Sequence, residues 1–136
     1  MSDSVEHIIH DNGIHEFILH SDDRGVVDEY ISYLEELVVK AIENDGNDKI
    51  HVLINLTQTQ NIPPFTYITK QERNLLHKYH HDRDKIHIRS AALARHDEMT
   101  IISLLEAFLK LLPVDTKVKS FESNQRDEAI EWLLEE

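Results

Sequence analysis

The sequence predicts an α/β fold, in which four helices connect a five-stranded mixed sheet in the order β-β-α-β-α-β-α-β-α. Short segments in which every second residue is apolar are separated by longer segments whose apolar residues recur every three or four positions. Strands that alternate with helices pair in parallel through right-handed crossovers. The first two strands follow each other directly, so only the first is expected to be antiparallel. The length of 136 residues suits a single domain over residues 1–136.

The first three elements are predicted from a turn motif and a helical stripe. Segments 7–10 and 14–20 flank Asn12-Gly13, a pair that favours a hairpin because both residues tolerate positive φ. A helix is expected over residues 27–42, where one apolar stripe recurs at helical spacing. Asp22 or Asp23 is suited to begin this helix, and Gly46 is suited to end it.

The middle of the chain predicts a strand over 50–56 and a helix that ends near residue 81. The polar segment 57–64 between them ends in Pro63-Pro64, and paired prolines suit a loop that leads into the first turn of a helix. The apolar residues of this helix share one face, and they are Phe65, Ile68, Leu75, Leu76 and Tyr79.

The last four elements are a strand over 86–94, a helix over 99–112, a strand over 117–121 and a final helix. The helix over 99–112 is apolar almost all round, so it is expected to be the most buried, with Pro113 as its stop. Asn124 is expected to cap the final helix. The residues expected on its inner face are Ala129, Ile130, Leu133 and Leu134.

The two faces of the predicted strands differ in polarity. In segment 50–56 one face is wholly apolar, and the other carries His51, Leu53 and Asn55. We therefore expect helices mainly on one side of the sheet. The mixed face has two interpretations, a solvated face or a surface for a partner or a second copy. The second is motivated by polar residues interleaved with leucines, namely His51, Asn55, His87 and Arg89 with Leu53 and Leu93.

Composition excludes several classes of function. Acidic residues outnumber basic ones 26 to 14, and a net charge of −12 argues against general nucleic-acid binding. The chain has no cysteine, which excludes disulfides and thiolate chemistry and fits a reducing compartment. The N-terminus lacks the features of a signal peptide. The apolar stretch 99–114 contains Glu106 and Lys110 and is too short to cross a bilayer. We expect a cytoplasmic protein without a membrane span.

The chain has ten histidines, and an enzyme that uses histidines is a third interpretation beside the two preferred below. His77 and His81 have the i, i+4 spacing of metal ligands, with Asp84 as a third candidate. However, Lys70 and Arg73 share that side of the helix, and cations disfavour a divalent metal, so a solvated basic face is the preferred interpretation. No glycine-rich phosphate loop, nucleophile elbow or triad spacing is present. We predict no catalytic residue, no metal and no cofactor.

The end of the chain resembles a known family. Val-Lys-Ser-Phe at 118–121, followed by Asp-Glu-Ala-Ile-Glu-Trp-Leu at 127–133, is similar to the closing signature of small bacterial SpoIIAA-like proteins, which share their fold with STAS domains. The resemblance implies a non-catalytic regulatory or protein-interaction module. Its partner would be another protein or a second copy in a homodimer. The fold is also related to the lipid-binding Sec14-type superfamily, which implies an alternative function as a binder of a small apolar ligand or lipid.

The loop after the third predicted strand departs from the STAS pattern. STAS antagonists of anti-sigma factors carry Asp-Ser-Ser/Thr-Gly there, and a kinase phosphorylates a serine of that motif. Segment 57–64 of this chain has no such motif, so the resemblance does not imply the phosphoswitch. Helix capping and turn bonding would also explain its hydroxyl groups. The candidate binding residues of this loop are Thr57, Thr59, Pro63, Pro64 and Thr66.

Overall fold

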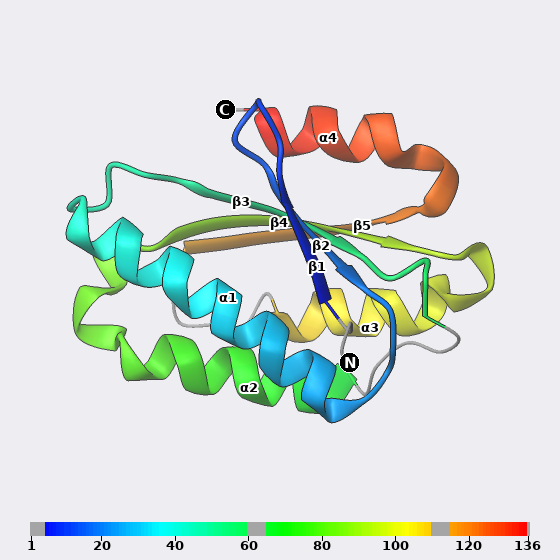
Figure 1. The fold of residues 1–136 in the computed structure, drawn as a ribbon, viewed down its shortest axis with the longest axis horizontal. Coiled ribbons are helices and arrows are strands. Elements are labelled where there is room, and N and C mark those ends of the chain that lie inside the picture. Colours follow the sequence, from blue (N-terminus) through cyan, green and yellow to red (C-terminus); the bar gives the residue numbers. More distant parts are fainter. Residues whose placement is uncertain (1–4, 60–64, 110–114, 136) are drawn as a thin grey trace.

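A five-stranded sheet with the strand order β1-β2-β3-β4-β5 forms the centre of the molecule (Figure 1). The computed structural model describes residues 5–59, 65–109 and 115–135. β1 pairs with β2 antiparallel, and all other pairs are parallel, which confirms the predicted mixed sheet. The strands are β1 (Val5–Ile9), β2 (His15–Leu19), β3 (Ile50–Asn55), β4 (His87–Ala94) and β5 (Asp115–Glu122).

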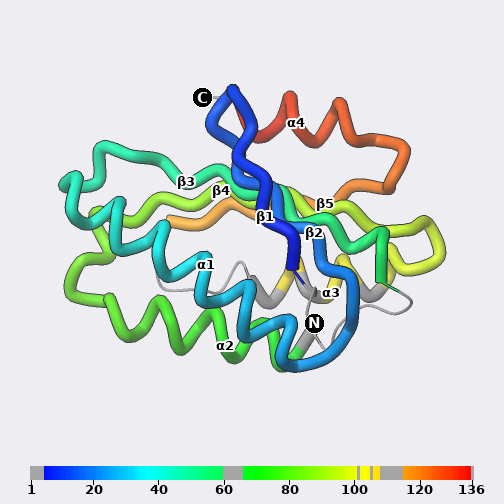
Figure 2. The backbone as a smooth tube through the Cα atoms, viewed as in Figure 1, coloured from blue at the N-terminus to red at the C-terminus, as the bar shows by residue number. Residues whose placement is uncertain are grey.

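Three helices lie on one face of the sheet and the fourth lies on the other (Figures 1 and 2). The helices are α1 (Arg24–Glu43), α2 (Phe65–Lys78), α3 (Met99–Leu109) and α4 (Arg126–Leu134). Short 3-10 segments precede β4 (His80–Lys85), α3 (His96–Glu98) and α4 (Ser123–Gln125). The element order agrees with the prediction, although α2 ends three residues earlier than expected and continues as 3-10 helix. The predicted end of α3 near Pro113 lies outside the described residues.

The position of α4 corrects the expectation for the mixed face of the sheet. Helices α1 to α3 are crossovers between sequential parallel strands, so the right-handed rule places all three on the same side. Helix α4 follows the last strand and is not a crossover, and it packs on the opposite face. Leu53 and Leu93 are buried there against Ala129 and Leu133. The centre of this face is therefore a second core, not a solvated or dimer-forming surface.

Two glycines adopt the conformations that their turns require. Gly13 has a φ of +89° in the β1–β2 turn, as the Asn-Gly motif predicts. Gly46 has a φ of +77° after α1, and its N–H donates to the carbonyl of Ala41 at 2.9 Å. A Cβ atom at position 46 would lie 2.8 Å from the Cα of Lys85, so this turn also needs glycine for space.

Part of α3 faces solvent, although the sequence predicts it to be the most buried helix. Of its described side chains, Ile102 is buried, whereas Leu104 is 48% exposed and Ala107 is exposed. An apolar pattern on all sides does not specify which side faces the core. None of the helices within residues 5–59, 65–109 and 115–135 is long and apolar enough to cross a membrane.

The start of α4 also differs from the prediction. Glu122 and Gln125 form a reciprocal capping box, so Asn124 lies inside the first 3-10 turn and is not the cap. Ala129 and Leu133 are buried as expected, but Leu134 is exposed. The helical region therefore begins earlier than Asn124 suggested.

Candidate functional site

The carboxyl ends of the parallel strands bring part of the predicted site together. Ligands of open α/β sheets bind at this edge. Thr57 and Thr59 lie in the turn that follows β3, where Thr57 is half-buried and Thr59 is buried. Thr66 is exposed in the first turn of α2. Pro63 and Pro64, the other two predicted residues, lie outside the described residues.

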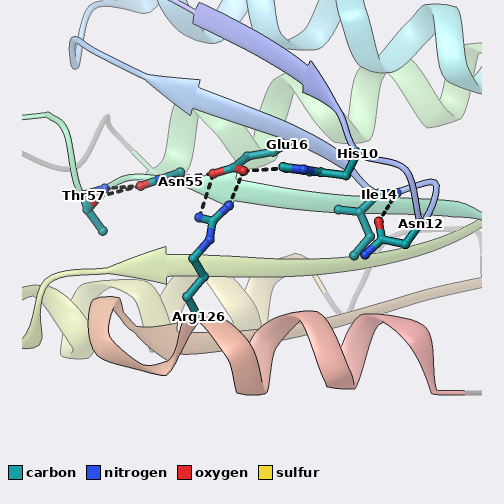
Figure 3. A network of polar contacts seen from close by, with 7 residues as sticks. All are labelled: His10, Asn12, Ile14, Glu16, Asn55, Thr57 and Arg126. Carbon is teal, nitrogen blue, oxygen red and sulfur yellow. Dashed lines mark hydrogen bonds and ion pairs between the residues drawn. The ribbon is translucent and has the colours of Figure 1, made fainter.

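A buried carboxylate lies beside this turn and holds three elements together (Figure 3). Glu16 in β2 is 1% exposed. Arg126, at the start of α4, donates to both oxygens of this carboxylate through its two terminal nitrogens. Nη1 lies 2.9 Å from Oε2, and Nη2 donates to Oε1. His10 Nε2 lies 2.8 Å from Oε1, and Asn55 Nδ2 donates to Oε2 at 3.2 Å. The β1–β2 turn, the end of β3 and the start of α4 therefore meet at one carboxylate.

Asn55 connects this carboxylate to the predicted loop. Its Oδ1 accepts hydrogen bonds from the backbone N–H of Thr57 at 3.0 Å and from the Thr57 hydroxyl at 2.6 Å. On the other side of the turn, Arg95 donates to the backbone carbonyl of Thr59 and pairs with Glu98 at 2.9 Å. The turn is thus fixed at its start by the last residue of β3 and at Thr59 by the residue that follows β4.

The network keeps Glu16 ionised. Burial by itself would raise the pKa of this carboxyl, but hydrogen bonds from Arg126, His10 and Asn55 outweigh burial and lower the pKa to about 2. The carboxylate is a weak base that already accepts several hydrogen bonds, so it is unsuited to proton transfer at neutral pH. Its role is structural, because it positions the loop and the helix. We call Glu16 and its three partners, His10, Asn55 and Arg126, the clamp.

The sequence analysis did not identify Glu16, Asn55 or Arg126 as a unit. Two local signals were present. Glu16 is a charged residue directly before three apolar residues of β2, and such a residue needs a partner when buried. Arg126 lies in the first turn of a helix, where the helix dipole disfavours a cation. Because the two residues are 110 positions apart, only the folded chain shows that they pair.

The histidine cluster of α2 remains a surface feature. The His77 and His80 rings stack at 5.2 Å between centroids, and those of His80 and His81 lie 4.0 Å apart. Within the part of the chain that the structure describes, no group of three histidine, aspartate or glutamate side chains is placed to hold a metal ion.

Comparison with protein families identifies the fold that carries this site. The model of the SpoIIAA-like family matches residues 21–134. The chain belongs to the SpoIIAA-like family. Such SpoIIAA-like domains are in general regulatory or interaction modules. The match begins after β2, so Glu16 and His10 lie outside it, while Asn55 and Arg126 lie inside. No curated protein and no solved structure shows a significant match to the chain.

Proposed function

We propose that this SpoIIAA-like domain is a non-catalytic regulatory module that binds a protein partner at the carboxyl edge of its sheet. The contact surface is the loop after β3, with Thr57, Pro63, Pro64 and Thr66, and the buried Thr59 supports the loop through its hydrogen bond to the Leu56 carbonyl. The observation that carries the proposal is the buried clamp at Glu16, which fixes the start of this loop against the start of α4. A surface that is ordered before binding loses less conformational entropy when a partner docks.

Regulation in this proposal does not involve a phosphorylated serine. Segment 57–64 stands where STAS antagonists carry the phosphorylated motif, and it contains two threonines and two prolines instead. The Thr57 hydroxyl already donates to Asn55, which supports a structural role for it. Intact protein purified from its native cell is expected to show no mass increase of one phosphate. A phosphorylated form on Thr57 or Thr59 would contradict this part of the proposal.

The partner is a protein in the cytoplasm, either another chain or a second copy of this one, and the whole chain acts as one domain. The absence of cysteine supports a reducing compartment. The interface is not the centre of the α4 face, because Leu53 and Leu93 are buried there. In this proposal a homodimer forms through the loop edge.

Site-specific photocrosslinking in the native cell tests the contact surface. Gln58 is exposed at the tip of the turn, so a photoreactive residue in its place would face a bound partner. We expect one discrete adduct from position 58, whose mass distinguishes a second copy from another protein. Asn74, exposed on α2, is the matched control. Equal labelling from both positions, or none from position 58, would contradict the proposal.

A cavity in the main core supports a second candidate function, binding of a small apolar ligand. Mostly apolar residues line a cavity of about 20 Å³ between the sheet and helices α2 and α3, together with Glu72, Glu106, Ser90 and Ser120. Glu72 Oε2 is buried without a hydrogen-bond partner among the described residues, so a ligand hydroxyl could donate to it. The cavity has room for a single water, and a ligand would have to displace side chains to enter.

Denaturation in the presence of straight-chain alkanols tests this second function. A ligand at a hundredfold excess over its Kd is expected to raise the free energy of unfolding by about 2.7 kcal/mol. Ala92 lines the cavity, so Ala92→Val should reduce the gain by filling the space. If no alkanol stabilises the protein, or if Ala92→Val leaves the gain unchanged, this function is excluded for that cavity.

A further inference from the structure

The α4 face of the sheet is uncovered at the end opposite to the clamp. Figure 1 shows that α4 ends before it reaches the first residues of β3, β4 and β5. A groove of about 90 Å³ lies there. We call it the β3–β5 groove, and its polar lining residues are Lys49, His51, His87, Arg89, Asp115, Lys117 and Glu135.

The strand register places three basic side chains in one row across this groove. Arg89 in β4 is the partner of His51 in β3 and of Lys117 in β5. All three lie on the α4 face, because they alternate with residues that face the other helices. Arg89 and Lys117 are like charges at directly paired positions of β4 and β5, and such a pair destabilises a sheet. In a chain with 26 acidic and 14 basic residues, this row is a local concentration of positive charge that an anion would stabilise.

Arg89 is held in place before any ligand arrives. Its guanidinium lies 4.2 Å above the Trp132 ring, its Nε donates to the Trp132 carbonyl at 2.9 Å, and its side chain is 15% exposed. The remaining edge, at Nη2, lies 3.4 Å from Glu135, whose side chain is 64% exposed. A ligand anion can displace this exposed carboxylate without disturbing the stacked arginine. The planar fork of arginine matches the oxygen geometry of phosphate.

The other acidic residue of the groove is already paired. Asp115 accepts from His87 at 2.9 Å across β4 and β5. Exposed charges more than about 8 Å from the groove are screened by salt at physiological strength. Within the groove, Lys49, Arg89 and Lys117 outnumber Asp115 and Glu135 by three to two.

A larger groove adjoins the same residues. It has a volume of about 460 Å³ and shares Lys49, Ile50 and His51 with the β3–β5 groove. Its other walls include Lys40 of α1 and His15 of β2, together with one acidic residue, Asp48. This space is sufficient for the remainder of a small molecule whose charged group lies at Arg89.

We propose that the β3–β5 groove binds the phosphate group of a small phosphorylated molecule. The site lies at the opposite edge of the sheet from the loop of the proposed function and does not depend on it. Arg89 supplies the fork, Lys117 supplies a charge from the edge strand, and His51 and Lys49 complete the wall next to the larger groove.

Titration with inorganic phosphate, followed through the backbone amide signals in NMR, tests the site. Sodium chloride of equal ionic strength is the reference. We expect saturable shifts at His51, Arg89 and Lys117 in the unmodified protein. Lys117 is exposed on the edge strand, so Lys117→Gln should leave the fold intact. The variant should weaken phosphate binding about tenfold, as expected for the loss of one charged hydrogen bond.

Lys119→Gln is the matched control. Lys119 lies two residues further along the same face of β5, outside the groove, beside the Phe121 ring at 5.3 Å. Lys119→Gln removes the same charge as Lys117→Gln but from outside the groove, so this variant should leave the phosphate affinity unchanged. Equal weakening by both variants would show general charge screening and overturn the proposal. Shifts that do not saturate, or saturation by succinate but not by phosphate, would also overturn it.

Discussion

Replacing Glu72 with glutamine is expected to raise the free energy of unfolding at pH 8 by about 3 kcal/mol. Glu72 is 6% exposed beneath α2. The Tyr30 hydroxyl donates to its Oε1 at 3.1 Å, and Oε2 has no partner among the residues that the structure describes. Burial raises the pKa of this carboxyl to about 7, although the Tyr30 hydrogen bond opposes the shift. At pH 8 the folded protein therefore carries a buried, poorly solvated charge that glutamine removes.

The effect has a defined pH window. As the pH rises from about 4.5 to 7, the unfolded chain releases the Glu72 proton and the folded chain retains it, so stability falls with pH. Urea denaturation at pH 4 and pH 8 should show the gain from Glu72→Gln only at the higher pH. Glu131→Gln, an exposed change on α4, is the control and should have little effect at either pH. A Glu72→Gln protein that is less stable than the parent at pH 8 would refute the assignment.

The matching change at Glu16 is expected to act in the opposite direction. Glu16→Gln should lower the free energy of unfolding at pH 7 by about 3 kcal/mol, because the pKa of this carboxyl is about 2 in the folded protein. Removing one partner of a buried ion pair costs about 3–5 kcal/mol. We expect a loss at the lower end of this range, because the Arg126 side chain is 40% exposed and can turn toward water when its partner is removed.

Measuring the free energy of unfolding at a series of acid pH values gives the contribution of Glu16 to stability. The stabilisation is complete above pH 4.5 and is lost as the pH falls toward 2, since the unfolded chain then binds the proton first. The parent should therefore lose stability between these values more steeply than Glu16→Gln. A double-mutant cycle with Arg126→Gln isolates the pair. A Glu16→Gln protein within about 0.5 kcal/mol of the parent at pH 7 would show that the clamp contributes no more than an ordinary surface contact.

Much of the fold followed from local patterns. The Asn12-Gly13 pair predicted the hairpin, in which Gly13 takes the positive φ and the Asn12 side chain accepts from the backbone N–H of Ile14. The apolar stripe of α1 and the alternation in β3 each repeat with the period of their own element. Right-handed crossovers then placed α1, α2 and α3 on one face. For the site, the sequence located the turn at Thr57 and Thr59 but not the carboxylate that holds it.

The sequence by itself determined which elements form and, except in α3, which face of each is apolar, since propensity and periodicity act over a few residues. Only the tertiary structure decided what the faces meet. Helix α4 packs over Leu53 and Leu93. The sequence did not predict this side, because the crossover rule does not apply to a helix that follows the last strand. Glu16 meets Arg126, and Arg89 lies beside Lys117, because strand register and chain path bring together residues that are far apart in the sequence. Contacts between residues so far apart leave no repeating pattern within a short segment, so they cannot be predicted from local periodicity.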